Sequence, residues 1–153
     1  MKNVVTCRIM AAVLGFLLLS PTVALSDNAI QWMPYEEGLH RAAQEGKKVL
    51  VVFSIDGCDA CRQLDQSFRD PAVIAHVNES FVPISVNAGN RGDIAKQYRV
   101  FGYPTLWFVT SAGEPIGGEI GFLLPKDLLQ KLCYVSSDSY THMSFPSFVK
   151  KNR

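Results

Sequence analysis

Short apolar runs alternate with amphipathic segments along the chain from about residue 28 onward. Val49–Ile55 is a nearly continuous run of β-branched and aromatic residues, which predicts a strand buried on both faces at the centre of a sheet. Phe81–Val86 has the same pattern and predicts a second central strand. Shorter strands are predicted at Ile30–Met33, at Thr105–Val109 directly after a proline, and at Pro115–Ile120.

The segments between these runs have the spacing of helices. Tyr35–Glu45 follows a proline and precedes a glycine, and Pro125–Val135 gathers its leucines on one face. Further helices are predicted at Arg62–Arg69, Ala72–Asn78 and Asp93–Tyr98. Strands and helices that alternate in this way indicate one α/β domain over residues 27–135. The pattern defines no structure for the C-terminal tail, 136–153, which is polar and aromatic with a basic tip.

The N-terminus has a different composition. A basic segment precedes the uninterrupted apolar run Ile9–Leu19, and small residues follow at Ala24 and Ser26. These are the parts of a secretory signal peptide. The run is shorter than the roughly 20 residues that a helix needs to span a bilayer. We therefore expect residues 1–26 to be a signal peptide that is removed on export.

Composition and charge narrow the range of partners. With 48% apolar residues, 19% charged residues and a formal net charge of +1, the chain resembles neither a disordered protein nor a polyanion binder. Loss of Lys2 and Arg8 with the signal peptide keeps it close to neutral. We expect a monomer with no nucleic-acid or membrane-surface partner. Four cysteines in 153 residues are too few for a disulfide-stapled miniprotein, so they point to chemistry.

Two of the cysteines, Cys58 and Cys61, lie three positions apart, directly after the strand predicted at Val49–Ile55. On the first turn of a helix, side chains at this spacing lie on one side and can form a disulfide. The partial positive charge of a helix N-terminus favours a thiolate at Cys58, whereas Cys61 shares a face with Leu64 and points into the core. We expect Cys58 to be the attacking nucleophile and Cys61 the resolving thiol.

Other uses of this pair remain open. An exported protein can keep a structural disulfide, although so short a loop restrains the unfolded chain little. Two thiolates also suit Cu(I), whereas zinc needs more ligands than the scattered histidines offer: His40, His76 and His142. We predict no resident cofactor or metal. Cys133 lies on the apolar face of the last predicted helix, where we expect an ordinary buried cysteine.

The chain resembles the thioredoxin fold, a central mixed sheet flanked by helices, here with a strand and helix at the N-terminus. The features that carry the resemblance are the strand Val49–Ile55, the Cys58–Cys61 junction, the Gly102–Thr105 turn and the hairpin at Gly113. Trp32, Tyr35 and Leu39 are spaced as in exported thioredoxin-like proteins. The resemblance implies a periplasmic thiol–disulfide oxidoreductase. It also implies that Pro104 is a cis proline facing the disulfide and that Tyr103 contacts an extended substrate.

Two positions depart from cytosolic thioredoxins. Val52 stands where those proteins place a buried aspartate, so the base that would accept the proton of Cys61 is missing here. Asp56 is the nearest replacement in the sequence. Gly57 stands where those proteins carry tryptophan, so we expect a more open surface around Cys58.

Charges beside the pair bear on the direction of electron flow. Asp56 and Asp59 flank Cys58, and Arg62 is the nearest cation in the sequence. Negative charge opposes the thiolate, which makes the disulfide harder to reduce and favours a reductase over a disulfide oxidase or isomerase. Such a reductase would act on protein disulfides in the periplasm and would need an electron donor in the membrane. A Cu(I)-binding module and a non-catalytic partner-binding domain are the alternatives from other classes.

Overall fold

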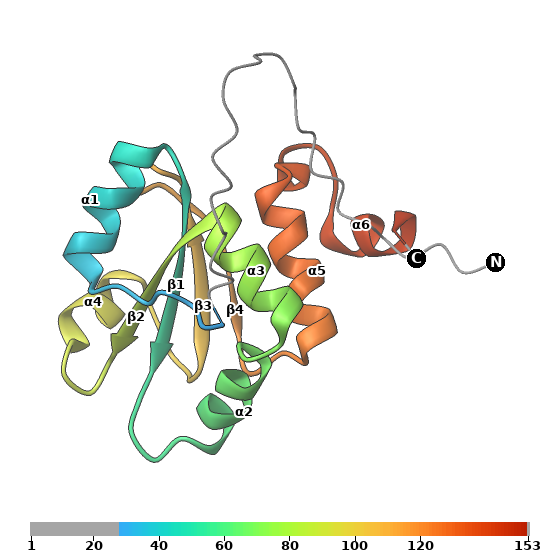
Figure 1. Cartoon of the computed structure of the whole chain (residues 1–153). Helices are drawn as coiled ribbons and strands as arrows, with labels where there is room; N and C mark the ends of the chain where they lie inside the picture. Colours follow the sequence, from blue (N-terminus) through green and yellow to red (C-terminus); the bar gives the residue numbers. More distant parts are fainter. Residues whose placement is uncertain (1–27, 153) are drawn as a thin grey trace, which may run out of the picture.

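A four-stranded mixed sheet forms the centre of the computed structural model, which describes residues 28–152 (Figure 1). Its strands are β1 (Lys48–Ser54), β2 (Phe81–Asn87), β3 (Thr105–Val109) and β4 (Pro115–Ile120). They lie in the order β2-β1-β3-β4; β1 is parallel to β2 and antiparallel to β3, and β4 is antiparallel to β3. The prediction of a central strand after Lys48 is confirmed, because β1 has a neighbour on each side.

Helices cover both faces of this sheet (Figure 1). α1 (Tyr35–Glu45) and α4 (Gly92–Gln97) pack on one face, and α3 (Pro71–Ser80) and α5 (Pro125–Ser136) pack on the other. α2 (Asp59–Ser67) follows β1 and joins the second group through Leu64. Each face of the sheet has its own cluster of buried apolar side chains, and alternate β1 residues pack in one or the other. Val49, Val51 and Phe53 lie on the α1 side, and Leu50 and Val52 lie on the α3 side. Burial on both faces explains why this strand shows no polar alternation.

The N-terminal strand predicted at Ile30–Met33 is wrong. Only Met33 pairs with the sheet, through an isolated parallel bridge to Ile84. The Met33 N–H donates to the carbonyl of Pro83 at 2.9 Å, and the next residue, Pro34, already caps the start of α1. Proline has no N–H and therefore cannot extend the ladder, so the expected strand and helix become a one-residue bridge and a helix.

The position predicted for the second strand is also corrected. The Phe81–Val86 pattern predicts a central strand, but β2 lies at one end of the strand order. It is still buried at five of its seven positions, because α1 and α3 pack against it and the Met33 bridge covers part of its outer edge. A continuous apolar run therefore reports burial on two faces, which an end strand can have as well.

The C-terminal tail has structure that the pattern did not define. It contains a 3₁₀ turn, η1 (Ser139–Thr141), and a helix, α6 (Phe145–Lys151). The Tyr134 hydroxyl of α5 donates to the carbonyl of Met143 at 2.6 Å. The Tyr134 ring also lies 5.3 Å from the rings of both Phe145 and Phe148, measured between centroids. The tail is thus attached to α5 by aromatic contacts.

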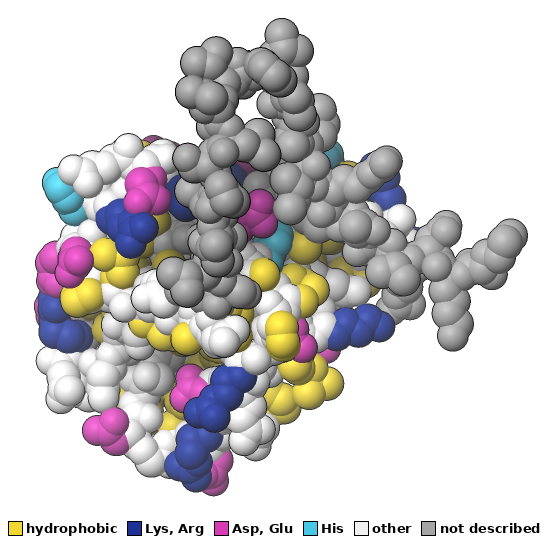
Figure 2. All heavy atoms as spheres, viewed as in Figure 1, with side chains coloured by type: hydrophobic (Ala, Val, Ile, Leu, Met, Phe, Trp, Pro, Cys, Tyr) yellow, Lys and Arg dark blue, Asp and Glu magenta, His cyan; other side chains and the backbone are white. Residues whose placement is uncertain are grey.

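The described part of the chain contains no helix long and apolar enough to span a membrane. The expected signal peptide, 1–26, lies outside the described residues. On the face seen in Figure 2, basic and acidic side chains are interspersed with apolar ones, as a near-neutral formal charge suggests.

Candidate active site

The cysteine motif begins where β1 ends. Ser54 is the last residue of β1, and a three-residue turn leads to Cys58, which caps the N-terminus of α2. Gly57 in this turn has a φ of 74°, in the left-handed region that favours glycine. Any side chain at this position would strain the turn, so its conformation favours the glycine that stands here.

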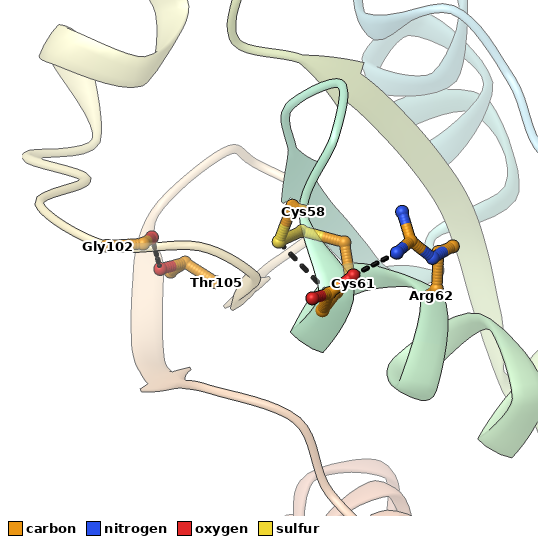
Figure 3. Close-up of a disulfide and its surroundings, with 6 residues drawn as sticks. Cys58, Cys61, Arg62, Gly102 and Thr105 are labelled. Atoms are coloured by element: carbon orange, nitrogen blue, oxygen red, sulfur yellow. Dashed lines mark hydrogen bonds and ion pairs between the residues drawn. A yellow bond between two sulfur atoms is a disulfide. The ribbon is translucent and has the colours of Figure 1, made fainter.

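Cys58 and Cys61 form a disulfide, with their Cα atoms 5.2 Å apart (Figure 3). The Cys61 N–H donates to the Sγ of Cys58 at 3.1 Å, so this sulfur occupies the position of a helix N-cap acceptor. Cys58 is half-buried, whereas Cys61 is only 5% exposed. An incoming group therefore reaches Cys58 first, and the same N–H would stabilise a thiolate on that sulfur.

The two carboxylates near the pair both have partners. Asp59 forms an ion pair with Arg62 one turn along α2, and both side chains are exposed. A dashed line at Arg62 marks this ion pair in Figure 3. Asp56 accepts a hydrogen bond from the Nδ2 of Asn87 at 3.0 Å. Asn87 ends β2, directly opposite Ser54 at the end of β1. The sequence analysis missed Asn87, although the carboxyl ends of parallel neighbours meet at one edge, which is a signal that could have found it.

The loop before β3 lies at the same edge of the sheet. Thr105 pairs with Phe53 near the end of β1, which places the Gly102–Thr105 turn beside the cysteine motif (Figure 3). The Tyr103–Pro104 peptide bond is cis, Pro104 is buried and Tyr103 is half-buried. The Thr105 hydroxyl donates to the carbonyl of Gly102 at 2.7 Å and closes the turn.

Val52 and Cys133 complete the set of residues singled out in the sequence. Val52 is 6% exposed and packs in the apolar cluster of the α3 side, so its position supplies no carboxyl group. Cys133 is partly exposed, which corrects the expectation of a buried residue. The buried face of α5 runs through Leu128, Leu132 and Val135, and Cys133 lies one position off that line.

Metal ligands do not gather in the described part of the chain. Residues 28–152 contain no group of three or more His, Cys, Asp or Glu side chains placed to hold a metal ion. His76 on α3 instead contacts the hydroxyl of Ser136 on α5, with its Nε2 at 3.0 Å from the Oγ. Burial lowers the pKa of His76 below its ordinary value.

A family model described as a thioredoxin-like domain matches residues 35–136. The chain belongs to this thioredoxin-like family. The matched region contains Cys58, Cys61 and Pro104 and ends with α5. The mixed sheet with helices on both faces is accordingly the thioredoxin fold, as the resemblance implied.

Solved and curated relatives of this chain include a thioredoxin and a protein disulfide-isomerase. A thioredoxin from Thermus thermophilus, known from its solution structure, is 33% identical, with a TM-score of 0.64, over 70% of this chain and 87% of that one. A protein disulfide-isomerase from Hordeum vulgare is 32% identical over 51% of this chain and 15% of its own length. The thiol:disulfide interchange protein DsbD of Campylobacter jejuni (strain RM1221) is 28% identical over 72% of this chain and 21% of its own length. This thioredoxin-like chain thus spans about a fifth or less of the length of these curated relatives.

The geometry defines what this site can do chemically. A half-buried sulfur at a helix N-terminus, a buried partner sulfur and a turn with a cis proline lie at one edge of the sheet. Together with the family match, this arrangement supports thiol–disulfide exchange.

Proposed function

We propose that this protein is a periplasmic thiol–disulfide oxidoreductase that acts mainly as a reductase of protein disulfides. The observation that carries the proposal is the Cys58–Cys61 disulfide at the start of α2, in a chain of the thioredoxin-like family. The exposure difference between the two cysteines supplies an attacking and a resolving position.

The proposed exchange has two steps. The thiolate of reduced Cys58 attacks one sulfur of the substrate disulfide, forming a mixed disulfide and releasing the other substrate sulfur as a thiolate. Cys61 then loses its proton to water and attacks the Cys58 sulfur, which releases the second substrate thiolate and forms the Cys58–Cys61 disulfide. Two electrons pass to the substrate, and its two thiolates take up protons from water. The Cys58–Cys61 disulfide must then be reduced again by the dithiol of another protein. We propose that this electron donor is a membrane protein.

The charged side chains near Cys58 support a reductase. Asp56 and Asp59 both lie within two residues of Cys58, and Arg62 offsets only Asp59 through its ion pair. Asp56 is held by a neutral amide, so its negative charge counters the stabilisation that the Cys61 N–H gives the Cys58 thiolate. A less stable thiolate makes the disulfide harder to reduce.

The direction is tested by the redox potential. The purified protein is equilibrated with defined ratios of reduced and oxidised glutathione, and its free thiols are quantified. We expect a potential of about −200 mV or lower, and one near −120 mV, typical of strong oxidants, would contradict a reductase.

Trapping tests the chemistry itself. Replacing Cys61→Ser removes the resolving thiol, so substrate proteins from a periplasmic extract should remain attached to Cys58 as mixed disulfides. The matched variant Cys58→Ser should capture none. Tight Cu(I) binding by the intact pair without any adduct would favour the copper-binding alternative. Export is checked separately by cell fractionation and by an N-terminus that begins at Asp27.

A further inference from the structure

An open hollow of about 590 Å³ lies between the C-terminal end of α4 and the loop that leads to Pro104. Five residues carry its chemistry: Lys96, Arg99, Val100, Phe101 and Tyr103. We call it the α4 hollow. Tyr103 lines this hollow and directly precedes the cis proline, so the hollow is continuous with the loop beside the disulfide.

The hollow presents an apolar surface to solvent. Phe101 is 86% exposed, the largest value among the exposed large hydrophobic residues of the described chain. Val100 and Tyr103 are half-buried beside it. A protruding ring next to partly covered apolar side chains is typical of a surface that receives another molecule.

Two cations at the hollow have no acidic partner in the described part of the chain. Lys96 and Arg99 are exposed, and neither takes part in any ion pair found among residues 28–152. The acid at the start of α4, Asp93, is already paired with Arg91, at 3.2 Å between Oδ1 and Nε. The positive charge of the hollow is therefore available to an outside carboxylate.

The backbone at Arg99 gives a second, independent indication. Arg99 lies one residue beyond Tyr98, the C-cap of α4, and has a φ of 51°, in the left-handed region. Its N–H donates to the carbonyl of Lys96 at 3.0 Å, and the N–H of Val100 donates to that of Ala95 at 2.9 Å. A helix that ends in this way ordinarily has glycine at the left-handed position. An arginine here lowers the stability of the fold. What it offers in return, and glycine does not, is a charged side chain at the hollow.

We propose that the α4 hollow binds an acidic, extended segment of the protein substrate next to its reactive cysteine. Substrate carboxylates would lie against Lys96 and Arg99, and a neighbouring apolar side chain against Phe101. The inference rests on the proposed function and adds the class of substrate: disulfides flanked by acidic residues.

The test uses three substrates of the reduced, purified protein. Two are peptides of one extended sequence with a single disulfide, flanked by glutamate in one and by glutamine in the other. The third, dithiodipyridine, is small and uncharged and reports basal exchange. We expect the glutamate peptide to be reduced about three- to tenfold faster than the glutamine peptide, since each exposed ion pair contributes modestly, and the ratio should fall as salt is raised.

Variants assign this preference to the hollow. The double variant Lys96→Gln/Arg99→Gly should reduce the two peptides at nearly equal rates. The matched control, Lys150→Gln on α6, removes a cation on a different element and should keep the wild-type ratio. Equal peptide rates in the wild type, a preference that survives in the double variant, or its loss in the control would each overturn the inference.

The same substrates separate the two proposals. If wild-type protein reduces dithiodipyridine but treats the two peptides alike, only the acidic-segment inference fails. If it does not reduce dithiodipyridine at all, the proposed oxidoreductase function fails and the inference fails with it.

Discussion

Cys58 and Cys61 are neighbours in sequence but have different surroundings. The Cys58 sulfur is half-buried and accepts an N–H from the first turn of α2, whereas Cys61 is buried under the same helix. The first turn of a helix presents N–H groups to its cap and turns the fourth residue inward, so one local structure produces both environments. The division between attacking and resolving sulfur therefore follows from where the motif starts its helix.

Arg99 provides a prediction at the scale of one residue. Arg99→Gly should raise the free energy of unfolding by about 0.5–1 kcal/mol, because glycine adopts the left-handed conformation without the Cβ penalty while losing more backbone freedom on folding. Urea titration of both proteins measures the change. Arg99→Ala is the matched control, since alanine keeps the strain and should bring no gain. A gain in Arg99→Ala equal to that in Arg99→Gly would show that the side chain, and not the backbone, is the destabilising feature.

Some site residues could be read from the sequence and others could not. The spacing of Cys58 and Cys61 after a buried strand indicated the site, because motif and strand are local in sequence. Asn87 became part of it only through the register that sets β2 beside β1. Arg99 gave no signal, because a positive φ at a residue other than glycine is a property of the folded backbone.

At the scale of elements, Gly38 allows α1 to pack directly against β2. A Cβ built on Gly38 would overlap the side chain of Ile84. Gly38→Ala should therefore lower the free energy of unfolding by about 1–3 kcal/mol, the usual cost of overpacking a core. Gly92→Ala, in open space at the start of α4, is the control and should cost little or nothing. If both variants unfold at the same urea concentration, α1 is not packed this closely.

The contact between α3 and α5 predicts a pH dependence. Burial lowers the pKa of His76 in the folded protein, so the unfolded chain binds the proton more readily. Neutral His76 makes its full contribution to the free energy of unfolding above the pKa of the unfolded chain, about 6.5. This contribution is lost as the pH falls towards the pKa of His76 in the folded protein. Urea unfolding from pH 7.5 to 5 should show a fall in stability that His76→Gln makes shallower. His142→Gln, exposed in the tail, should leave the wild-type slope, and an unchanged slope in His76→Gln would contradict the assignment.

Periodicity predicted the elements that pack through one clear apolar face and failed at the ends of the domain. α5 begins at the residue expected and ends one residue later. Ile30–Met33 looked like a strand because it is apolar, yet Pro34 leaves room for only one bridge. α6 was missed because it is only seven residues long, and the one pair of rings that packs on Tyr134, Phe145 and Phe148, is too short a pattern to define a helical period.

At the scale of the whole molecule, the candidate active site lies at the edge of the sheet where β1 and β2 end and β3 begins. The ends of β1 and β2 bring Asp56, two residues before Cys58, into contact with Asn87. The antiparallel β3 begins at the same edge, at Thr105. Both faces of the sheet are covered by helices, so this edge is where loops can carry chemistry without disturbing either core cluster. The α4 hollow adjoins it because α4 connects β2 to the loop before β3.

Because redox poise and folding are linked, the direction of electron flow predicts which form of the protein is more stable. If the folded protein holds its disulfide more firmly than the unfolded chain does, the oxidised form must have the larger free energy of unfolding, by about 1.4 kcal/mol for each 30 mV. Charge near Cys58 favours this case, and strong oxidants show the reverse, since folding stabilises their dithiol. Urea unfolding of the oxidised protein and of the protein kept reduced by dithiothreitol measures the difference. Cys58→Ala/Cys61→Ala is the control, and its midpoint should not respond to dithiothreitol. If the reduced form has the larger free energy of unfolding, the proposed direction of electron flow is reversed. The exchange chemistry of the pair would still stand.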